Sequence, residues 1–249
     1  MSIHVKRLRV FAGPNGSGKS TLYDYLVKTE AFHSYYYINP DIILKDLNTS
    51  FDLNNFPIIY SDDELINFLN ASSFQSKVDY KFSEVISLNE NKVSLKYQSL
   101  KDISYLAAVI ADFIRTKMII SNSSFSFESV FSHESKIKIL EDAKNADFKI
   151  YLYFIATSNP EINIQRVKNR VESGGHDVAE DKVNSRYYKT MNNLYSAFEL
   201  SDKAFFFDNS NLKMNGSFDF FAEKNGKKVY LSDPLSVPHW FFDYILKKI

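Results

Sequence analysis

The sequence predicts an α/β fold in which a mostly parallel sheet carries helices on both faces. Two patterns predict it. Short apolar runs alternate with segments of helical periodicity along most of the 249 residues, an order that favours parallel strands joined by helices. In addition, a glycine-rich turn at 13–18 stands between the first apolar run and the first helical pattern. A turn in that position connects a strand to a helix in folds that bind phosphate.

The elements follow from these patterns in chain order. Five apolar runs predict the strands of the sheet: 8–12, 35–38, 124–129, 149–155 and 204–207. Helical spacing predicts helices at 19–28, from Asp41, from about 62, and at 105–120, 134–144, 163–172, 180–197 and after Pro238. Alternating patterns predict two hairpins, 78–88 with 93–97, and 218–231. We expect one domain, 1–249, with an insertion at 48–101 and a C-terminal hairpin and helix at 212–249.

Composition excludes several classes of protein. The chain has 30 basic and 30 acidic side chains, so its net charge gives no reason to expect a nucleic-acid or membrane partner. It has no cysteine, which excludes disulfides and thiolate chemistry. No apolar stretch reaches the roughly 18 residues of a membrane span, and the first ten residues do not form a signal peptide. A cytoplasmic protein is the expectation.

Residues 13–20 carry the strongest motif, because they match G-x-x-x-x-G-K-[ST] at every fixed position. Glycines let backbone N–H groups surround a phosphate, and the helix that follows adds its positive end. Lys19 is expected to neutralise the β- and γ-phosphates and Ser20 to bind Mg²⁺. The predicted nucleotide-binding residues are Gly13, Pro14, Asn15, Gly16, Ser17, Gly18, Lys19, Ser20 and Thr21.

This motif, the P-loop, indicates that the protein binds a nucleotide but does not indicate which reaction the protein catalyses. The N-K-x-D sequence by which GTPases read guanine is absent, which favours ATP over GTP. Ser173-Gly174-Gly175 mimics part of the ABC-type ATPase signature. However, the run 204–207 ends in Asp208-Asn209 and lacks the catalytic glutamate of that class.

The remaining pattern suits a small-molecule kinase, which needs an acid for the acceptor, a group supporting magnesium, and lid arginines. Asp41 follows the second strand and is the candidate base, with a helix N-cap as the competing interpretation. Glu128 ends the third strand, where a buried acid needs a partner. Arg166 and Arg170 share a helix face beside a Gly-Gly hinge, and Arg186 lies on the next helix.

Taken together, these residues resemble the zeta-toxin-like P-loop kinases, in particular their toxin-unrelated relatives labelled as ATPases. The matching stretches, in the family's order, are 11–21, 37–41, 125–130, 166–178, 184–187 and 207–210. The match covers most of 1–210 but not 48–101. The resemblance implies a kinase-like P-loop NTPase fold with a five-stranded core, a helical lid and, here, an inserted subdomain.

The resemblance also assigns roles. Lys19 and Ser20 would be the P-loop pair, Asp41 the base, Glu128 a substrate or Mg²⁺ ligand, and Arg170 and Arg186 catalytic lid arginines. Arg166 and His176 would contact substrate. Characterised zeta toxins phosphorylate UDP-N-acetylglucosamine, so a nucleotide sugar is one candidate acceptor. The expected activity is ATP- and Mg²⁺-dependent transfer to a hydroxyl of a small molecule.

Two other interpretations stay open. One is an ATP-hydrolysing switch whose insertion at 48–101 contacts a macromolecule, and the other is a binding module that has lost catalysis. The sequence indicates no antitoxin or other protein partner.

Overall fold

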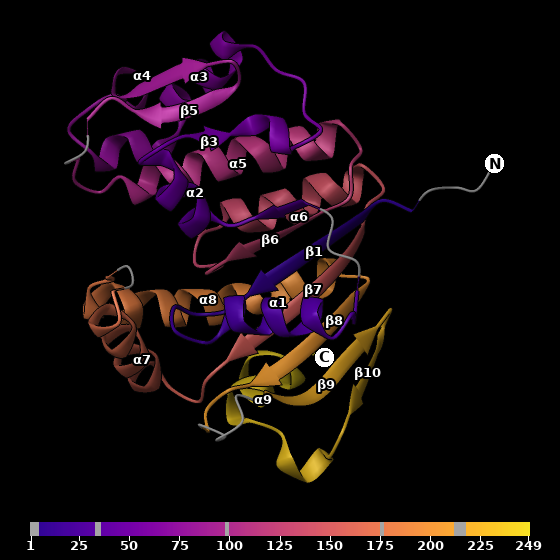
Figure 1. Cartoon of the computed structure of the whole chain (residues 1–249). Helices are drawn as coiled ribbons and strands as arrows, with labels where there is room; N and C mark the ends of the chain where they lie inside the picture. The colour runs from indigo at the N-terminus through magenta and orange to yellow at the C-terminus, as the bar shows by residue number, and fades with distance from the viewer. Residues whose placement is uncertain (1–4, 33–35, 98–99, 175–176, 212–217) are drawn as a thin grey trace. The chain divides into compact units, whose positions relative to one another are not determined.

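The structure is a computed structural model that describes residues 5–32, 36–97, 100–174, 177–211 and 218–249 (Figure 1). The chain divides into two compact units. The first comprises Met1–Ser34 and Ser126–Ile249, and the second comprises Tyr35–Phe125. The predicted insertion, 48–101, lies within the second unit.

The first unit contains most of the large sheet. Its strands are β1 (Arg7–Ala12), β6 (Phe125–Ser129), β7 (Lys149–Ala156), β8 (Lys203–Asp208), β9 (Asp219–Asn225) and β10 (Lys228–Leu231). Its helices are α1 (Lys19–Lys28), α6 (Ser135–Asn145), α7 (Pro160–Glu172), α8 (Glu180–Leu200) and α9 (His239–Tyr244), with short 3₁₀ helices at Pro234–Ser236 and Leu246–Lys248.

Within this unit the described strands of the sheet follow the order β10-β9-β8-β7-β1-β6. The predicted count of five strands is therefore wrong. The C-terminal hairpin was predicted, but β9 also pairs antiparallel with β8 and so extends the sheet. The central pairs β1–β7 and β7–β8 are parallel, as predicted.

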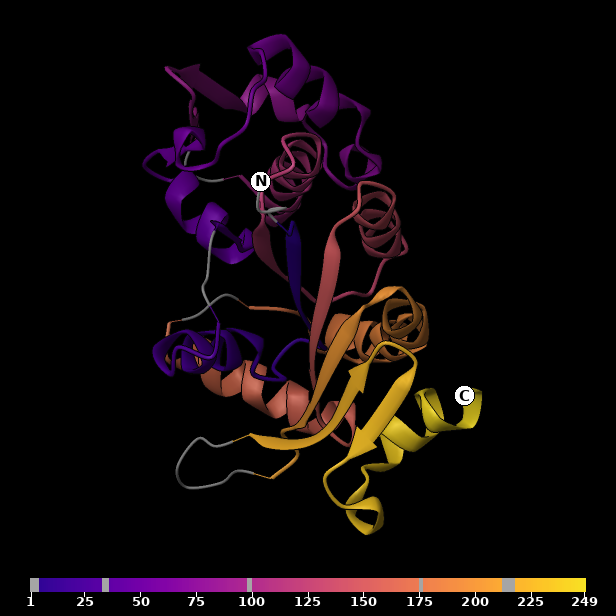
Figure 2. The same ribbon diagram turned by 90° about the vertical axis from the view of Figure 1, so that its right-hand side faces the viewer.

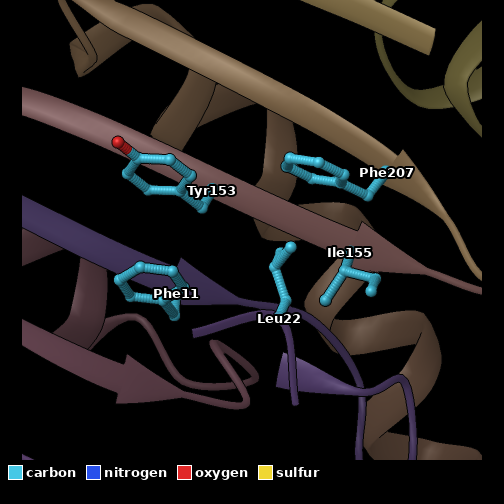
Figure 3. Close-up of a cluster of buried hydrophobic side chains, with 5 residues drawn as sticks. All are labelled: Phe11, Leu22, Tyr153, Ile155 and Phe207. Carbon is cyan, nitrogen blue, oxygen red and sulfur yellow. The ribbon is translucent and has the colours of Figure 1, made fainter. Parts of the chain in front are cut away.

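The central strands are largely buried on both faces, which explains why most of their residues are apolar. Helix α1 lies on one side of the sheet and helices α6 and α8 on the other (Figure 2). On the α1 side a cluster joins the two layers through five buried side chains (Figure 3): Phe11, Leu22, Tyr153, Ile155 and Phe207. The rings of Phe11 and Tyr153 stack with centroids 4.8 Å apart. This packing fixes α1, and with it the loop that precedes it, against the sheet.

The second unit is smaller. Its strands are β2 (Tyr36–Ile38), β3 (Phe51–Asp52), β4 (Ile86–Asn89) and β5 (Lys92–Leu95), and the last three form a sheet in the order β3-β5-β4. Its helices are α2 (Pro40–Leu47), α3 (Asp62–Ala71), α4 (Phe82–Val85) and α5 (Ser104–Ile120), with 3₁₀ helices at Leu53–Asn55 and Ser73–Lys77. The predicted strand 78–88 is wrong in its first part, because residues 82–85 form α4 and bury Phe82 and Val85.

Helix length and hydropathy give one further result for the described part of the chain. None of its helices combines the length and the apolar character that crossing a membrane would require.

Candidate nucleotide site

The predicted phosphate loop connects β1 to α1, and its glycines adopt conformations that side chains rarely take. Gly16 has φ of 73° and Gly18 has φ of 101°, both left-handed. Gly18 is also the N-cap of α1, and Lys19 is the first residue of that helix. A glycine cap adds no side-chain acceptor to compete with phosphate oxygens for the first N–H groups of α1.

Backbone atoms of two other elements lie close to this loop. A Cβ added to Gly13 would lie 2.0 Å from the carbonyl oxygen of Ile155, at the end of β7. One added to Gly16 would lie 2.7 Å from the carbonyl oxygen of Asn163, in α7. The loop therefore needs glycine at both positions, because backbone atoms of other elements occupy the space of a side chain.

Two asparagine side chains hold the loop in place. Asn163 Nδ2 donates to the carbonyl oxygen of Asn15 at 2.5 Å, and Asn209 Nδ2 donates to the carbonyl oxygen of Ser17 at 2.8 Å. Within the described residues the hydroxyl of Ser17 and the Oδ1 of Asn15 are buried without a hydrogen-bond partner. Buried hydroxyl groups and amide oxygens usually have a hydrogen-bond partner.

Lys19, Ser20 and Glu128 come together beside the loop. Ser20 Oγ donates to Glu128 Oε2 at 2.8 Å, and Lys19 Nζ lies 4.0 Å from Glu128 Oε1. Lys19 also donates to the carbonyl oxygen of Pro14 at 2.9 Å. The side chains of Lys19 and Glu128 are 7% and 10% exposed, so the ammonium and the carboxylate compensate each other's burial. The meeting follows from topology, since β6 is the neighbour of β1.

The hydroxyl of Ser20 and the carboxylate of Glu128 suit Mg²⁺ as metal ligands. The ion prefers oxygen ligands and usually binds through one or two protein groups together with water and substrate phosphates. Ser20 and Glu128 supply a hydroxyl and a carboxylate 2.8 Å apart where the phosphate loop ends and α1 begins. Among the described residues there is no cluster of three or more acidic, histidine or cysteine side chains that would make a protein-only metal cage.

The predicted lid arginines lie on α7 and α8. Arg166 and Arg170 share one face of α7, and Arg186 lies in the second turn of α8. Both terminal nitrogens of Arg166 are buried without a hydrogen-bond partner in the described part of the chain. Burial lowers the pKa of Arg166, and the attraction of Asp208 works against this change. A guanidinium in this state favours an anionic ligand.

Asp208 does not serve as a strand-end magnesium ligand in this arrangement. Its carboxylate accepts hydrogen bonds from Trp240 Nε1 at 2.8 Å and from the backbone N–H of Ser210 at 2.9 Å. Its strand, β8, is separated from β1 by β7. The carboxylate thus shapes the loop from which Asn209 reaches the phosphate loop.

Two predicted site residues cannot be joined to this cluster. Asp41 belongs to the second unit, where it is exposed in the first turn of α2. The N-cap of α2 is Asn39, whose Oδ1 accepts from the N–H of Asp41 at 2.9 Å. The competing interpretation of Asp41 as the cap is therefore wrong, and its carboxylate is left for another use.

His176 lies outside the described residues. Thr21 is exposed in the first turn of α1.

Asn163 and Asn209 were not predicted as site residues. A signal for Asn163 was present, because Asn159-Pro160 is a typical helix start. A helix beginning there gives a buried position to a polar residue among Ile162, Ile164 and Val167. Asn209 offers no comparable signal, because its contact depends on the pairing of β8 with β7.

Comparisons with known proteins give few sequence matches. No protein-family model matches the chain. An uncharacterized protein of Haemophilus influenzae is 44% identical over 63 residues, which are 25% of this chain and 45% of that protein.

Solved structures show the fold. A chain of the AvrRxo1-ORF1:AvrRxo1-ORF2 crystal structure with sulphate ions aligns with a TM-score of 0.56 and 15% identity, over 93% of this chain and 62% of that chain. The crystal structure of the same pair with ATP gives 0.56 and 15%, over 92% and 61%. This chain thus spans about three fifths of those it matches. These matches confirm the predicted α/β fold.

Proposed function

We propose that the protein is a P-loop phosphotransferase that moves the γ-phosphoryl group of ATP to a hydroxyl of a small molecule. The observation that carries the proposal is the meeting of Lys19 and Ser20 with the buried carboxylate of Glu128 at the phosphate loop. The structural match to a protein crystallised with ATP supports the choice of nucleotide.

Each residue has a role that its chemistry allows. Backbone N–H groups of the loop and the ammonium of Lys19 would bind the β- and γ-phosphates. Ser20 and Glu128 would hold Mg²⁺, which supplies positive charge to the phosphate oxygens when bound. Arg166, Arg170 and Arg186 would neutralise charge on the transferring group, for which a planar guanidinium is suited.

Transfer also needs a group to take the proton of the acceptor. In the proposed reaction the acceptor oxygen forms a bond to the γ-phosphorus while the bond from that phosphorus to the bridging oxygen of ADP breaks. The hydroxyl proton passes to the carboxylate of Asp41. His176 would contact the acceptor. A nucleotide sugar is one candidate acceptor, by resemblance to the zeta toxins.

A screen of fractionated metabolites tests this proposal. ATP consumption by the protein should depend on one small molecule, which gains a phosphoryl group detectable by mass spectrometry. The Lys19→Ala variant is the control and should consume no ATP with any fraction. Hydrolysis of ATP at the same rate in every fraction would contradict transfer to an acceptor.

The alternative is an ATP-hydrolysing switch whose segment 48–101 contacts a macromolecule. One observation favours it, since the structural relative was crystallised as a complex of two proteins. Under this alternative, hydrolysis without acceptor should rise when a protein partner is added, and deletion of the contact surface on 48–101 should remove the rise.

A further inference from the structure

A chain of hydrogen bonds connects the phosphate loop to both helices that carry the predicted lid arginines. Asn163 of α7 donates to the carbonyl oxygen of Asn15 at 2.5 Å. The hydroxyl of Thr157, just after β7, donates to Asn163 Oδ1. Tyr187 of α8 donates from its hydroxyl to the carbonyl oxygen of Thr157 at 2.7 Å. We call Asn163, Thr157 and Tyr187 the relay.

The relay is fully buried, which makes its geometry specific. Asn163 and Thr157 are 0% exposed and Tyr187 is 3% exposed. A buried polar group without a partner is costly, so these groups favour arrangements that keep them hydrogen-bonded. The Thr157 hydroxyl also lies 3.0 Å from the carbonyl oxygen of Asn159, a second acceptor. Burial raises the pKa of Tyr187, so its hydroxyl keeps the proton that it donates across the whole physiological range.

The arginines lie on α7 and α8, close in sequence to the relay residues of those helices. Arg166 and Arg170 follow Asn163 by three and seven residues and therefore lie on the same face of α7, about 4.5 and 10.5 Å farther along its axis. Arg186 immediately precedes Tyr187 in α8. Any shift of α7 or α8 relative to the phosphate loop would move these guanidinium groups and would break a relay bond.

A hydrogen bond attaches α8 to the neighbouring segment near the relay. Thr190 donates to the carbonyl oxygen of Val130 at 2.6 Å, which ties α8 to the segment after β6. The other end of the α7–α8 pair is less tightly packed. A cavity of about 150 Å³ lies between α7 and α8, and the ion pair of Lys168 with Glu180, 2.7 Å apart and half-exposed, borders it. The relay lies beside the phosphate loop, where Asn163 contacts Asn15.

We infer that Asn163, Thr157 and Tyr187 are positioning residues that hold the lid arginines in register with the phosphate loop. The protein then distinguishes a nucleotide with a γ-phosphate from ADP, because the arginines reach the γ-phosphate only from the helix positions that the relay fixes. The inference rests on the proposed function of the site. It adds residues that touch neither nucleotide nor acceptor.

Binding measurements test this without a known acceptor. Calorimetry with Mg²⁺ and either ADP or a non-hydrolysable ATP analogue should give tighter binding of the analogue to the wild-type protein. Tyr187→Phe and Thr157→Val each remove one relay hydroxyl with little change of volume or charge. Each should lower the ratio of analogue to ADP affinity by about tenfold and change ADP affinity by less than about twofold.

Two controls separate positioning from general damage. Tyr188→Phe removes a hydroxyl from the adjacent, exposed tyrosine of α8 and should leave the ratio unchanged. In the double variant Tyr187→Phe with Arg186→Ala, the two losses should be less than additive, because the relay acts through the arginines. Melting temperatures of all variants check that each is folded.

Several results would overturn the inference. They are an equal loss of ADP and analogue affinity, an unchanged ratio in folded Tyr187→Phe and Thr157→Val proteins, or fully additive losses in the double variant. A wild-type protein that binds neither nucleotide would contradict the proposed function itself, and the two failures can thus be told apart.

Discussion

At the scale of the residue, the charge of Glu128 is the most informative feature of the site. Its carboxylate faces an ammonium 4.0 Å away and a hydroxyl at 2.8 Å, all at the start of α1. The sequence predicted this acid from its place at the end of a strand. The sequence also assigned both Ser20 and Glu128 to Mg²⁺. The direct hydrogen bond between them was not predicted, and it forms because β6 lies beside β1.

Glu128→Gln should keep the fold and the hydrogen bond to Ser20 but lose the negative charge that supports Mg²⁺. We expect ATP turnover to fall at least about 100-fold, which corresponds to roughly 3 kcal/mol of the barrier, and the dependence on Mg²⁺ concentration to shift upward. A magnesium titration of the rate measures both. Glu134→Gln, an exposed acid before α6, is the matched control. Unchanged magnesium dependence in Glu128→Gln would contradict the assignment.

Asp41→Asn tests the proposed base. The change keeps the shape of the side chain and removes its ability to accept a proton, so ATP affinity should remain nearly the same while phosphoryl transfer is lost. Calorimetry and a transfer assay with the acceptor from the metabolite screen measure the two effects. Asp46→Asn, on the same helix, should transfer normally. Wild-type transfer rates in Asp41→Asn would exclude it as the base.

At the scale of the element, the phosphate loop requires glycine for two separable reasons. Gly16 combines a positive φ with a backbone oxygen in the space of its Cβ, whereas Gly226, with φ of 60° in the β9–β10 turn, has open space there. Gly226→Ala should therefore cost only the strain of a left-handed alanine, about 1–2 kcal/mol. Gly16→Ala should in addition displace α7 from the loop and abolish nucleotide binding. Chemical denaturation and calorimetry on both variants give the comparison. Normal nucleotide affinity in Gly16→Ala would contradict this account of the loop.

The end of α8 offers a second prediction at this scale. Lys224 of β9 is 5% exposed, and its ammonium donates to the last carbonyl oxygens of the helix: Phe198, Glu199 and Ser201. Lys224→Met keeps the stem but removes all three hydrogen bonds, while Phe198 O keeps the one from the Ser201 hydroxyl, at a cost of about 2 kcal/mol. The melting temperature should fall by roughly 4–8 °C. Lys227→Met, on an exposed turn, should not change it.

Elements with a clear hydrophobic pattern in the sequence were predictable. Elements that form because of tertiary packing were not. Strands β1, β7 and β8 are mostly apolar, and their positions agree with the prediction. Residues 82–85 have a strand-like composition, yet they form a helical turn because Phe82 and Val85 are both buried there. Local propensity cannot reveal such a tertiary preference.

At the scale of the whole molecule, the sequence predicted an α/β fold around a phosphate loop, and the structure and its relatives confirm the fold. Two features depend on long-range pairing and could not be predicted. The hairpin β9–β10 extends the sheet beside β8, and the chain separates into two compact units. The predicted insertion at 48–101 fills only part of the second unit, because contacts between α2 and α5 draw the flanking helices into it.

The most direct test of this account is the affinity of the purified protein for ATP, measured by calorimetry with and without Mg²⁺. We predict binding that requires Mg²⁺, that is lost in Lys19→Ala, and that raises the melting temperature of the wild-type protein as ligand concentration increases. A wild-type protein that shows no magnesium-dependent affinity for ATP or any other nucleoside triphosphate would contradict the account.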